Sequence, residues 1–220
     1  MVKKVVSKPV TRSDGKASRT AILDATLIII LRDGIRSVKY KSVAEVAGVT
    51  QSSIAYYFKD IPQLITEAFL HYLEGYEVGM EVARGVGKKI LAKYKGQDLQ
   101  AREVREAIVN DHVNSLMYII ASGDEDSATY MLLDRIFRNE MLQNPDLFGA
   151  LRAQDQKDLE AMEHFFQALG CKFPEEDAVQ LFSLLWFLSE RLLQNRHSDS
   201  EITYARRMLR NSLRQCLNLS

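Results

Sequence analysis

The chain has 220 residues, 46% of them hydrophobic, which is enough for one small and one medium domain with apolar cores. Its formal net charge at pH 7 is zero, so overall charge indicates no particular partner, and its longest apolar runs are too short to span a membrane. Two cysteines, Cys171 and Cys216, are too few for a disulfide framework and favour reduced thiols in a cytoplasmic protein, although one bridge is also compatible.

Charge is divided unevenly along the chain. Residues 1–60 hold 11 Lys and Arg against 5 Asp and Glu, a balance of +6, whereas the remaining residues carry a balance of −6. A basic module joined to an acidic one suits a protein that brings one end to a polyanion. The plainer alternative is a solvated surface with uneven charge, because terminal segments are often basic.

The first dozen residues lack apolar periodicity and contain Lys3, Lys4, Lys8 and Arg12. We expect a basic arm that follows the minor groove of DNA or adds non-specific attraction, while a plain disordered tail fits equally well. The segment lacks the apolar core of a secretion signal, so we do not interpret it as a targeting peptide.

Residues 43–58, with the sequence VAEVAGVTQSSIAYYF, predict two helices joined by a tight turn at Gly48. Val43, Val46 and Ala47 have helical spacing and are expected to face inward. Glycine reaches positive φ without steric cost, which a sharp reversal after a helix often requires. The segment therefore predicts a helical hairpin.

The second helix of this hairpin is expected to begin after Thr50, whose hydroxyl can accept a hydrogen bond from a free backbone N–H. Val49, Ile54 and Phe58 are expected to pack inward. The outward or marginal positions are Gln51, Ser52, Ser53, Tyr56 and Tyr57. Short hydroxyl and amide groups can approach bases and phosphates, and phenols can donate to phosphate oxygens. This pattern favours a helix-turn-helix whose second helix lies in the DNA major groove, the alternative being an ordinary hairpin with a polar face.

Segments on both sides of the hairpin strengthen that interpretation. Residues 19–25, with the sequence RTAILDA, run on to Gly34, the hairpin closes with residues 56–58, and Pro62-Gln63-Leu64 opens the next helix. In this order the segments resemble the TetR family of bacterial transcription regulators, over roughly residues 16–73. The resemblance implies an opening helix with a glycine stop, a DNA-binding hairpin and a helix that connects two domains.

Three positions depart from the family's usual pattern. Lys39 stands where a threonine usually begins the first helix of the hairpin, and Ala55 and Ile61 replace a tyrosine and a lysine that typically contact phosphate. Nearby lysines can supply charge instead. We therefore expect DNA contacts from Lys39, Lys41, Thr50, Gln51, Ser52, Ser53, Tyr56, Tyr57 and Lys59.

The predicted fold class is all-α with two domains. We expect a basic arm and a three-helix DNA-binding domain over residues 1–61, and a larger helical effector-binding and dimerisation domain over residues 62–220. Pro62 suits the first turn of a helix. Four glycines between residues 75 and 87 lower helical preference, so we expect this helix to fray there, a hinge between domains being the alternative.

Further helices are predicted over about residues 99–121, 124–141 and 145–169, followed by two at about 175–195 and 199–217. Ser198 with Glu201 predicts a capping box for the last one. The final two helices carry more apolar surface than a chain end needs, so pairing with a second copy would form a four-helix bundle. The resemblance implies the same homodimer interface, while burial within their own domain is the alternative.

Helical bundles bind small molecules in mostly apolar cavities, so we expect an unknown apolar or aromatic effector in the second domain. The candidate lining residues are Tyr72, Tyr76, Met117, Tyr118, Tyr130, Met131, Phe137 and Trp186. Each of them also fits ordinary core packing, because aromatic and methionine side chains at helical spacing usually pack against one another.

Motifs of catalysis are absent from the sequence. His71, His112, His164 and His197 have no partner at metal-ligand spacing, and there is no CxxC, phosphate loop or GxSxG motif. We expect no enzyme activity, metal, cofactor or membrane association. The predicted function is a TetR-like repressor in the bacterial cytoplasm, associated with the nucleoid and released from operator DNA by a small ligand. The alternative is a TetR-shaped protein-interaction module that has lost specific DNA binding.

Overall fold

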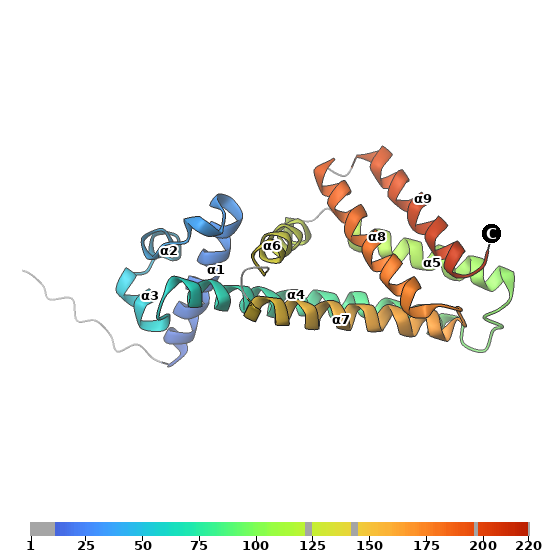
Figure 1. The fold of residues 1–220 in the computed structure, drawn as a ribbon, viewed down its shortest axis with the longest axis horizontal. Helices are drawn as coiled ribbons and strands as arrows, with labels where there is room; N and C mark the ends of the chain where they lie inside the picture. The colour runs from blue at the N-terminus through green and yellow to red at the C-terminus, as the bar shows by residue number, and fades with distance from the viewer. Residues whose placement is uncertain (1–11, 122–124, 142–144, 196–197, 220) are drawn as a thin grey trace, which may run out of the picture. The chain divides into compact units, whose positions relative to one another are not determined.

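A computed structural model of the chain describes residues 12–121, 125–141, 145–195 and 198–219. Within these ranges there are nine α-helices, one short 3₁₀ helix and no strand, which confirms the predicted all-α class (Figure 1). The basic arm lies outside the described residues, apart from Arg12. No helix in the described ranges is long and apolar enough to cross a membrane.

The chain forms two compact units. The first unit comprises residues 1–74 together with 132–147, and the second unit comprises residues 75–131 and 148–220. The first unit thus extends past residue 61 into the following helix, because side chains at the start of that helix bond to the first helix, as in the ion pair between Glu67 and Arg19.

The first unit begins with α1 (Arg12–Asp33), η1 (Ile35–Ser37), α2 (Tyr40–Ala47) and α3 (Gln51–Tyr57). It also contains the start of α4 (Ile61–Lys93) and part of α6 (Glu125–Met141). Gly34 follows α1 with a φ of 82°, and Gly48 ends α2 with a φ of 67°. Both values lie in the region that favours glycine, so the predicted glycine stops are confirmed.

Helices α2 and α3 pack on α1 through a small apolar core. Ile54 and Phe58 are fully buried, as predicted, and so is Val43. Val46 was expected to face inward, but it is 37% exposed and Ala44 is buried instead. The buried face of α2 is centred between residues 43 and 44, which places Val46 at its edge.

Helix α4 is continuous over 33 residues, so the predicted fraying at its glycines is wrong. At Gly87, within the second unit, a Cβ atom would lie 3.1 Å from Cδ2 of Phe165 on α7 (Pro145–Ala168). The missing side chain lets α4 and α7 approach closely. Tertiary packing therefore outweighs the low helical preference of glycine here.

The remaining helices of the second unit are α5 (Arg102–Ala121), α8 (Pro174–Gln194) and α9 (Asp199–Cys216), all near their predicted bounds. These three helices pack against one another. Their apolar core also includes side chains of α4 and α7, among them Ile90 and Phe166.

Glu201 does not form the predicted capping box. Ser198 is the N-cap of α9, but its side chain makes no capping hydrogen bond. The Glu201 carboxylate instead accepts from Nη2 of Arg191 at 2.9 Å, and the ion pair holds the pKa of Glu201 below its ordinary value. The contact joins the end of α8 to the start of α9, so a long-range ion pair has replaced the local cap.

Buried Arg105 connects three chain segments of the second unit. Its Nη1 donates to the carbonyl of Leu217 at 2.6 Å, its Nη2 donates to the carbonyl of Leu169 at 3.0 Å, and its Nε donates to the carbonyl of Leu99 at 3.1 Å. The side-chain oxygen of Gln100 accepts a further bond. The guanidinium therefore fixes the start of α5 to the ends of α7 and α9.

A second charged group joins α4 to α7. Nε of Arg84 donates to Oδ1 of the buried Asp158 at 2.5 Å, and its Nη2 donates to Oε2 of Glu77 at 2.8 Å. Together with Lys157, Arg84 lowers the pKa of Glu77 to about 2. The carboxylate is therefore ionised throughout the neutral range.

Cys171 and Cys216 are both free in the structure. Burial raises the pKa of Cys171 to about 11 and that of Cys216 to about 12. Because the thiolate is the reactive form, both side chains are chemically quiet at neutral pH.

Candidate nucleic-acid interface

The start of α3 is fixed by a cluster of hydroxyl groups. Oγ1 of Thr50 accepts from the backbone N–H of Ser53 at 3.1 Å, which confirms the predicted cap. The same oxygen lies 2.8 Å from Oγ of Ser52 and 2.9 Å from Oγ of Ser53. These three hydroxyls are therefore already hydrogen-bonded to one another at the edge of the exposed surface.

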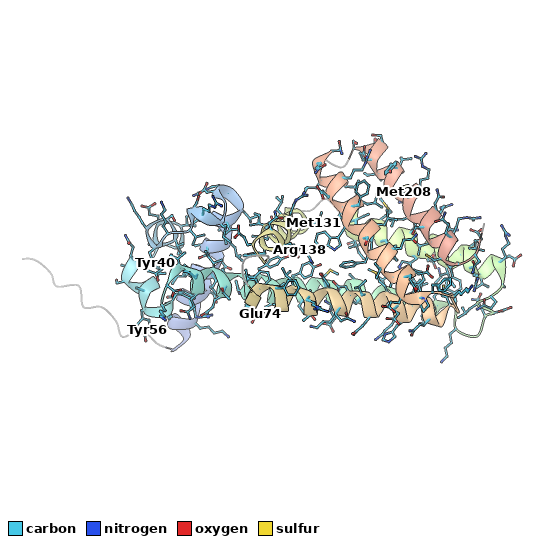
Figure 2. The ribbon with its side chains drawn as sticks, viewed as in Figure 1. Tyr40, Tyr56, Glu74, Met131, Arg138 and Met208 are labelled. Carbon is cyan, nitrogen blue, oxygen red and sulfur yellow. The ribbon has the colours of Figure 1, made fainter. Side chains whose placement is uncertain are left out.

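Beyond this cluster, α3 presents an exposed face. Gln51, Ser52, Ala55 and Tyr56 are all exposed. The Tyr56 side chain, labelled in Figure 2, is 82% exposed. Residues four apart lie above one another on a helix, so Gln51 pairs with Ala55 and Ser52 with Tyr56. The face is continuous and is not covered by other described residues of the first unit.

Tyr57 lies at the margin of that face and is half-buried. A Cβ atom on Gly15 would lie 3.4 Å from the Tyr57 hydroxyl, so the first turn of α1 lies beside the end of α3. The ring also packs edge-on against Tyr56 at a centroid distance of 5.1 Å. Lys16 follows Gly15 in α1 and is exposed, so it adds a cation near the end of α3. The sequence analysis did not single out Lys16, and its position beside Gly15 before the first predicted helix was the available signal.

Lys39, Lys41 and Lys59 are all exposed and form no ion pair within the described part of the chain. Lys39 is the N-cap of α2, and its backbone N–H donates to Oγ of Ser42 at 3.2 Å. Ser42 thus provides a capping hydroxyl although Lys39 stands where the family usually has threonine. The lysine side chains remain available for phosphate.

The end of α3 is held at Phe58, whose ring is fully buried. The Tyr40 hydroxyl donates to the Phe58 carbonyl at 3.1 Å, and the Arg19 guanidinium lies 5.4 Å from the centre of the ring. Tyr40 and Arg19 belong to α2 and α1, so two helices fix this one residue (Tyr40 is labelled in Figure 2). The Tyr40 contact could not be predicted from the sequence, because its partner is a backbone carbonyl 18 positions away.

The start of α4 holds the next residue. The backbone N–H of Lys59 donates to Oε1 of Gln63 at 2.7 Å, and Nε2 of Gln63 donates to Oε1 of Glu67 at 2.8 Å. Glu67 in turn pairs with Arg19. We call Arg19, Tyr40, Gln63 and Glu67 the α3 clamp. It joins α1, α2 and α4 to the end of the exposed helix.

The predicted effector residues are divided between the two units. Tyr72 and Phe137 are buried in the first unit, where their rings pack at a centroid distance of 5.7 Å. In the second unit, Met117 is buried in the core and Trp186 packs edge-on against Phe182 at 6.3 Å.

Three more of these residues are described in the second unit. Tyr76 and Met131 are half-buried, whereas Tyr118 is 79% exposed on α5. The side chain of Tyr130 lies outside the described residues. A surface pocket between α4 and α5, lined by Val86, Lys89, Ile90, Lys93, Asp111, Asn114 and Ser115, contains none of the predicted set.

A histidine lies in the core of the second unit, although the sequence indicated only an isolated histidine without a ligand partner. His112 is buried, its ring packs edge-on against Phe165 at 4.3 Å, and its Nδ1 has no hydrogen-bond partner among the described residues. Burial lowers its pKa to about 4, so it is neutral at pH 7. Its position among buried Ile108, Val109 and Leu116 was the available signal.

The sequence matches no protein-family model and no curated protein, but the fold matches solved structures closely. A transcriptional regulator from Rhodococcus aligns with a TM-score of 0.61 and 15% identity, covering 91% of this chain and 96% of that one. A TetR-like transcriptional regulator, also from Rhodococcus, aligns at 0.56 and 13%, covering 96% and 100%. A TetR-family member from Streptomyces coelicolor aligns at 0.55 and 20%, covering 89% and 97%. The chain therefore has the fold of TetR-family transcriptional regulators over nearly its whole length.

Proposed function

We propose that this protein is a TetR-like transcriptional regulator that binds operator DNA through α3. The exposed face of α3 carries this proposal, since the Thr50 cap fixes one end and the α3 clamp fixes the other. A recognition helix must keep its orientation while it exposes polar groups to the bases. Exposed lysines at both ends of the helix-turn-helix supply charge for the phosphates.

The protein acts as a homodimer through α8 and α9. Val179 and Phe187 are exposed on the outer side of α8, and Phe182 is half-buried beside them. The outer side of α9 is polar and includes exposed Arg206 and Arg210. An apolar strip with a charged border is typical of a protein interface. Two copies would place two recognition helices on half-sites related by a two-fold axis.

Replacing Phe187 by glutamate tests this interface. A carboxylate in this strip would have to be desolvated on association, so the dimer should dissociate at concentrations where the wild type stays paired. Sedimentation velocity measures the result. Val82→Glu, at another exposed apolar position, is the matched control and should leave association unchanged. An unchanged sedimentation coefficient for Phe187→Glu would place the interface elsewhere.

The regulator is a repressor in the bacterial cytoplasm, at the nucleoid, and a small, mostly apolar ligand releases it from DNA. The large apolar core of the second unit supports such a site, because His112 adds one neutral hydrogen-bonding group to apolar surroundings. Small-molecule sites commonly combine these two features. Helix α4 contributes residues to both units, so it is a continuous element through which a ligand could act on the DNA-binding unit.

A gel-shift titration tests the function directly. The full-length protein is titrated against DNA upstream of its own gene and against random duplex of equal length. We expect tighter binding to the upstream DNA and a steep loss of affinity as salt rises, because phosphate contacts release counterions. Equal binding to both duplexes would instead favour the protein-interaction module.

Tyr56→Ala tests the role of the exposed face. The side chain is almost fully exposed, so its loss should leave the helical circular dichroism and the dimer unchanged. We expect DNA affinity to fall by about tenfold, the usual effect of one lost contact to a charged group. A loss of helicity would show that Tyr56 is structural.

A further inference from the structure

The exposed face of α3 contains two columns of side chains with different chemistry. Gln51 and Ala55 form one column, and Ser52 and Tyr56 form the other. Members of a column are separated by about 6 Å along the helix axis. This distance is about two base-pair steps of DNA. The two members of one column can therefore reach bases about two steps apart in a single half-site.

Within the first turn of α3, Gln51 has the most hydrogen-bonding capacity left for a ligand. The hydroxyl of Thr50 bonds to those of Ser52 and Ser53. The Gln51 amide, by contrast, is exposed and bonds to no other described residue. It offers one acceptor and two donors in a plane. Residues at the start of a recognition helix are those that reach base edges.

Ala55 presents a methyl group at the next position of the same column. It is exposed on α3, so nothing in the first unit explains it as a packing residue. A small side chain lets the helix lie close to the base edges, where a larger one would hold it away. The apolar group that the major groove offers to a methyl is the C5-methyl of thymine.

We propose that Gln51 and Ala55 select A·T base pairs in each half-site. The Gln51 amide donates to N7 of one adenine and accepts from its N6 amino group, and the Ala55 methyl contacts the C5-methyl of a thymine about two steps away. Only adenine shows a paired donor and acceptor to a side-chain amide in the major groove. Tyr56, in the other column, donates to phosphate and adds affinity without base preference. The inference rests on the proposed function.

Selection from a pool of random DNA duplexes tests the adenine contact without knowledge of the operator. The full-length wild type should enrich a two-fold symmetric site with adenine at one position of each half. Gln51→Ala should lose that preference and bind the selected site about tenfold more weakly, the usual value for a bidentate base contact. Gln97→Ala, the same substitution at an exposed position of the second unit, is the matched control and should keep both the adenine preference and the affinity. Thermal unfolding of each variant checks the fold.

Replacing thymine by deoxyuridine in the selected site tests the methyl contact. Each thymine is replaced in turn, which removes only the C5-methyl group. At one position per half-site, the replacement should weaken the DNA affinity of the wild type by about fourfold, the value for burying one methyl group. Ala55→Gly should be insensitive to that replacement. Because glycine weakens a helix, Ala55→Ser serves as a second variant with the same expectation.

The outcomes separate this inference from the proposed function. If the wild type enriches no sequence, DNA-specific regulation itself is wrong. If it enriches a site and Gln51→Ala retains the same adenine preference, or if no deoxyuridine position matters, the proposed base contacts are wrong and the regulator stands.

Discussion

Polar side chains have opposite roles in the two units. In the first unit Thr26 and Asp134 are buried, but the polar side chains around α3 lie at or near the surface. There Thr50, Tyr40 and Gln63 hold a helix that is itself exposed. In the second unit Arg105 and Asp158 are buried and connect helices to one another. Loss of a contact in the first unit should therefore impair DNA binding more than stability, and loss in the second unit should do the reverse.

Arg105→Met gives the largest expected effect and tests the second half of this comparison. Methionine keeps much of the volume but leaves the carbonyls of Leu217 and Leu169 without their donor. Each buried unsatisfied group costs about 1–3 kcal/mol, so the free energy of unfolding should fall by about 3–5 kcal/mol. Urea denaturation measures it. Under conditions where the variant is folded, its DNA affinity should remain that of the wild type.

The matched control is Arg102→Met, on the same helix but exposed. Surface substitutions usually change stability by less than about 0.5 kcal/mol. A loss below about 1 kcal/mol for Arg105→Met would mean that water replaces the guanidinium, and Arg105 would not be the link between α5, α7 and α9.

His112 makes the stability of the second unit depend on pH. Its pKa is about 4 in the folded protein against 6.5 for an ordinary histidine, so between these values the unfolded chain binds a proton that the folded protein does not. Stability should therefore fall as pH decreases from 6.5 to 4, by up to about 3 kcal/mol from this residue.

Substituting His112 by leucine should remove this part of the pH dependence and leave the fold intact at neutral pH. Urea denaturation of both proteins across this pH range measures the difference. His164→Leu, at an exposed position of α7, is the control and should follow the wild type. Parallel curves for the wild type and His112→Leu would show that His112 is solvated.

Local signals in the sequence predicted much of the fold. Gly34 and Gly48 mark helix ends because their backbone conformation is left-handed, and Thr50 caps α3 through a residue three positions away. Errors arose where distant packing decides. Helix α4 continues through Gly87, because the missing side chain leaves room for Phe165 of α7. Glu201 pairs with Arg191 instead of capping its own helix.

The candidate DNA-binding site shows the same difference between local signals and contacts of distant residues. The exposed residues of α3 could be found from their pattern after Gly48, since an amphipathic helix shows which side faces outward. The α3 clamp could not be found from the sequence pattern, because Arg19 and Glu67 are 48 positions apart and only the folded chain brings them together. The effector set remains a prediction, because its residues are divided between the two units. Aromatic spacing predicts burial, but it does not show which of the two units buries each ring.

Tyr40→Phe has the smallest expected effect and compares the two units most directly. It removes one hydroxyl, the donor to the Phe58 carbonyl, and should cost about 1 kcal/mol of stability. Tyr94→Phe removes the same atom in the second unit, where the hydroxyl donates to Asp111 at 2.8 Å, and should cost about as much. Only Tyr40→Phe should also weaken DNA binding, by about fivefold, because it frees the end of α3. Thermal unfolding and gel-shift titration of the two variants measure both quantities. If both variants weaken DNA binding equally, the clamp has no special role in orienting α3 and the contrast between the two units does not hold.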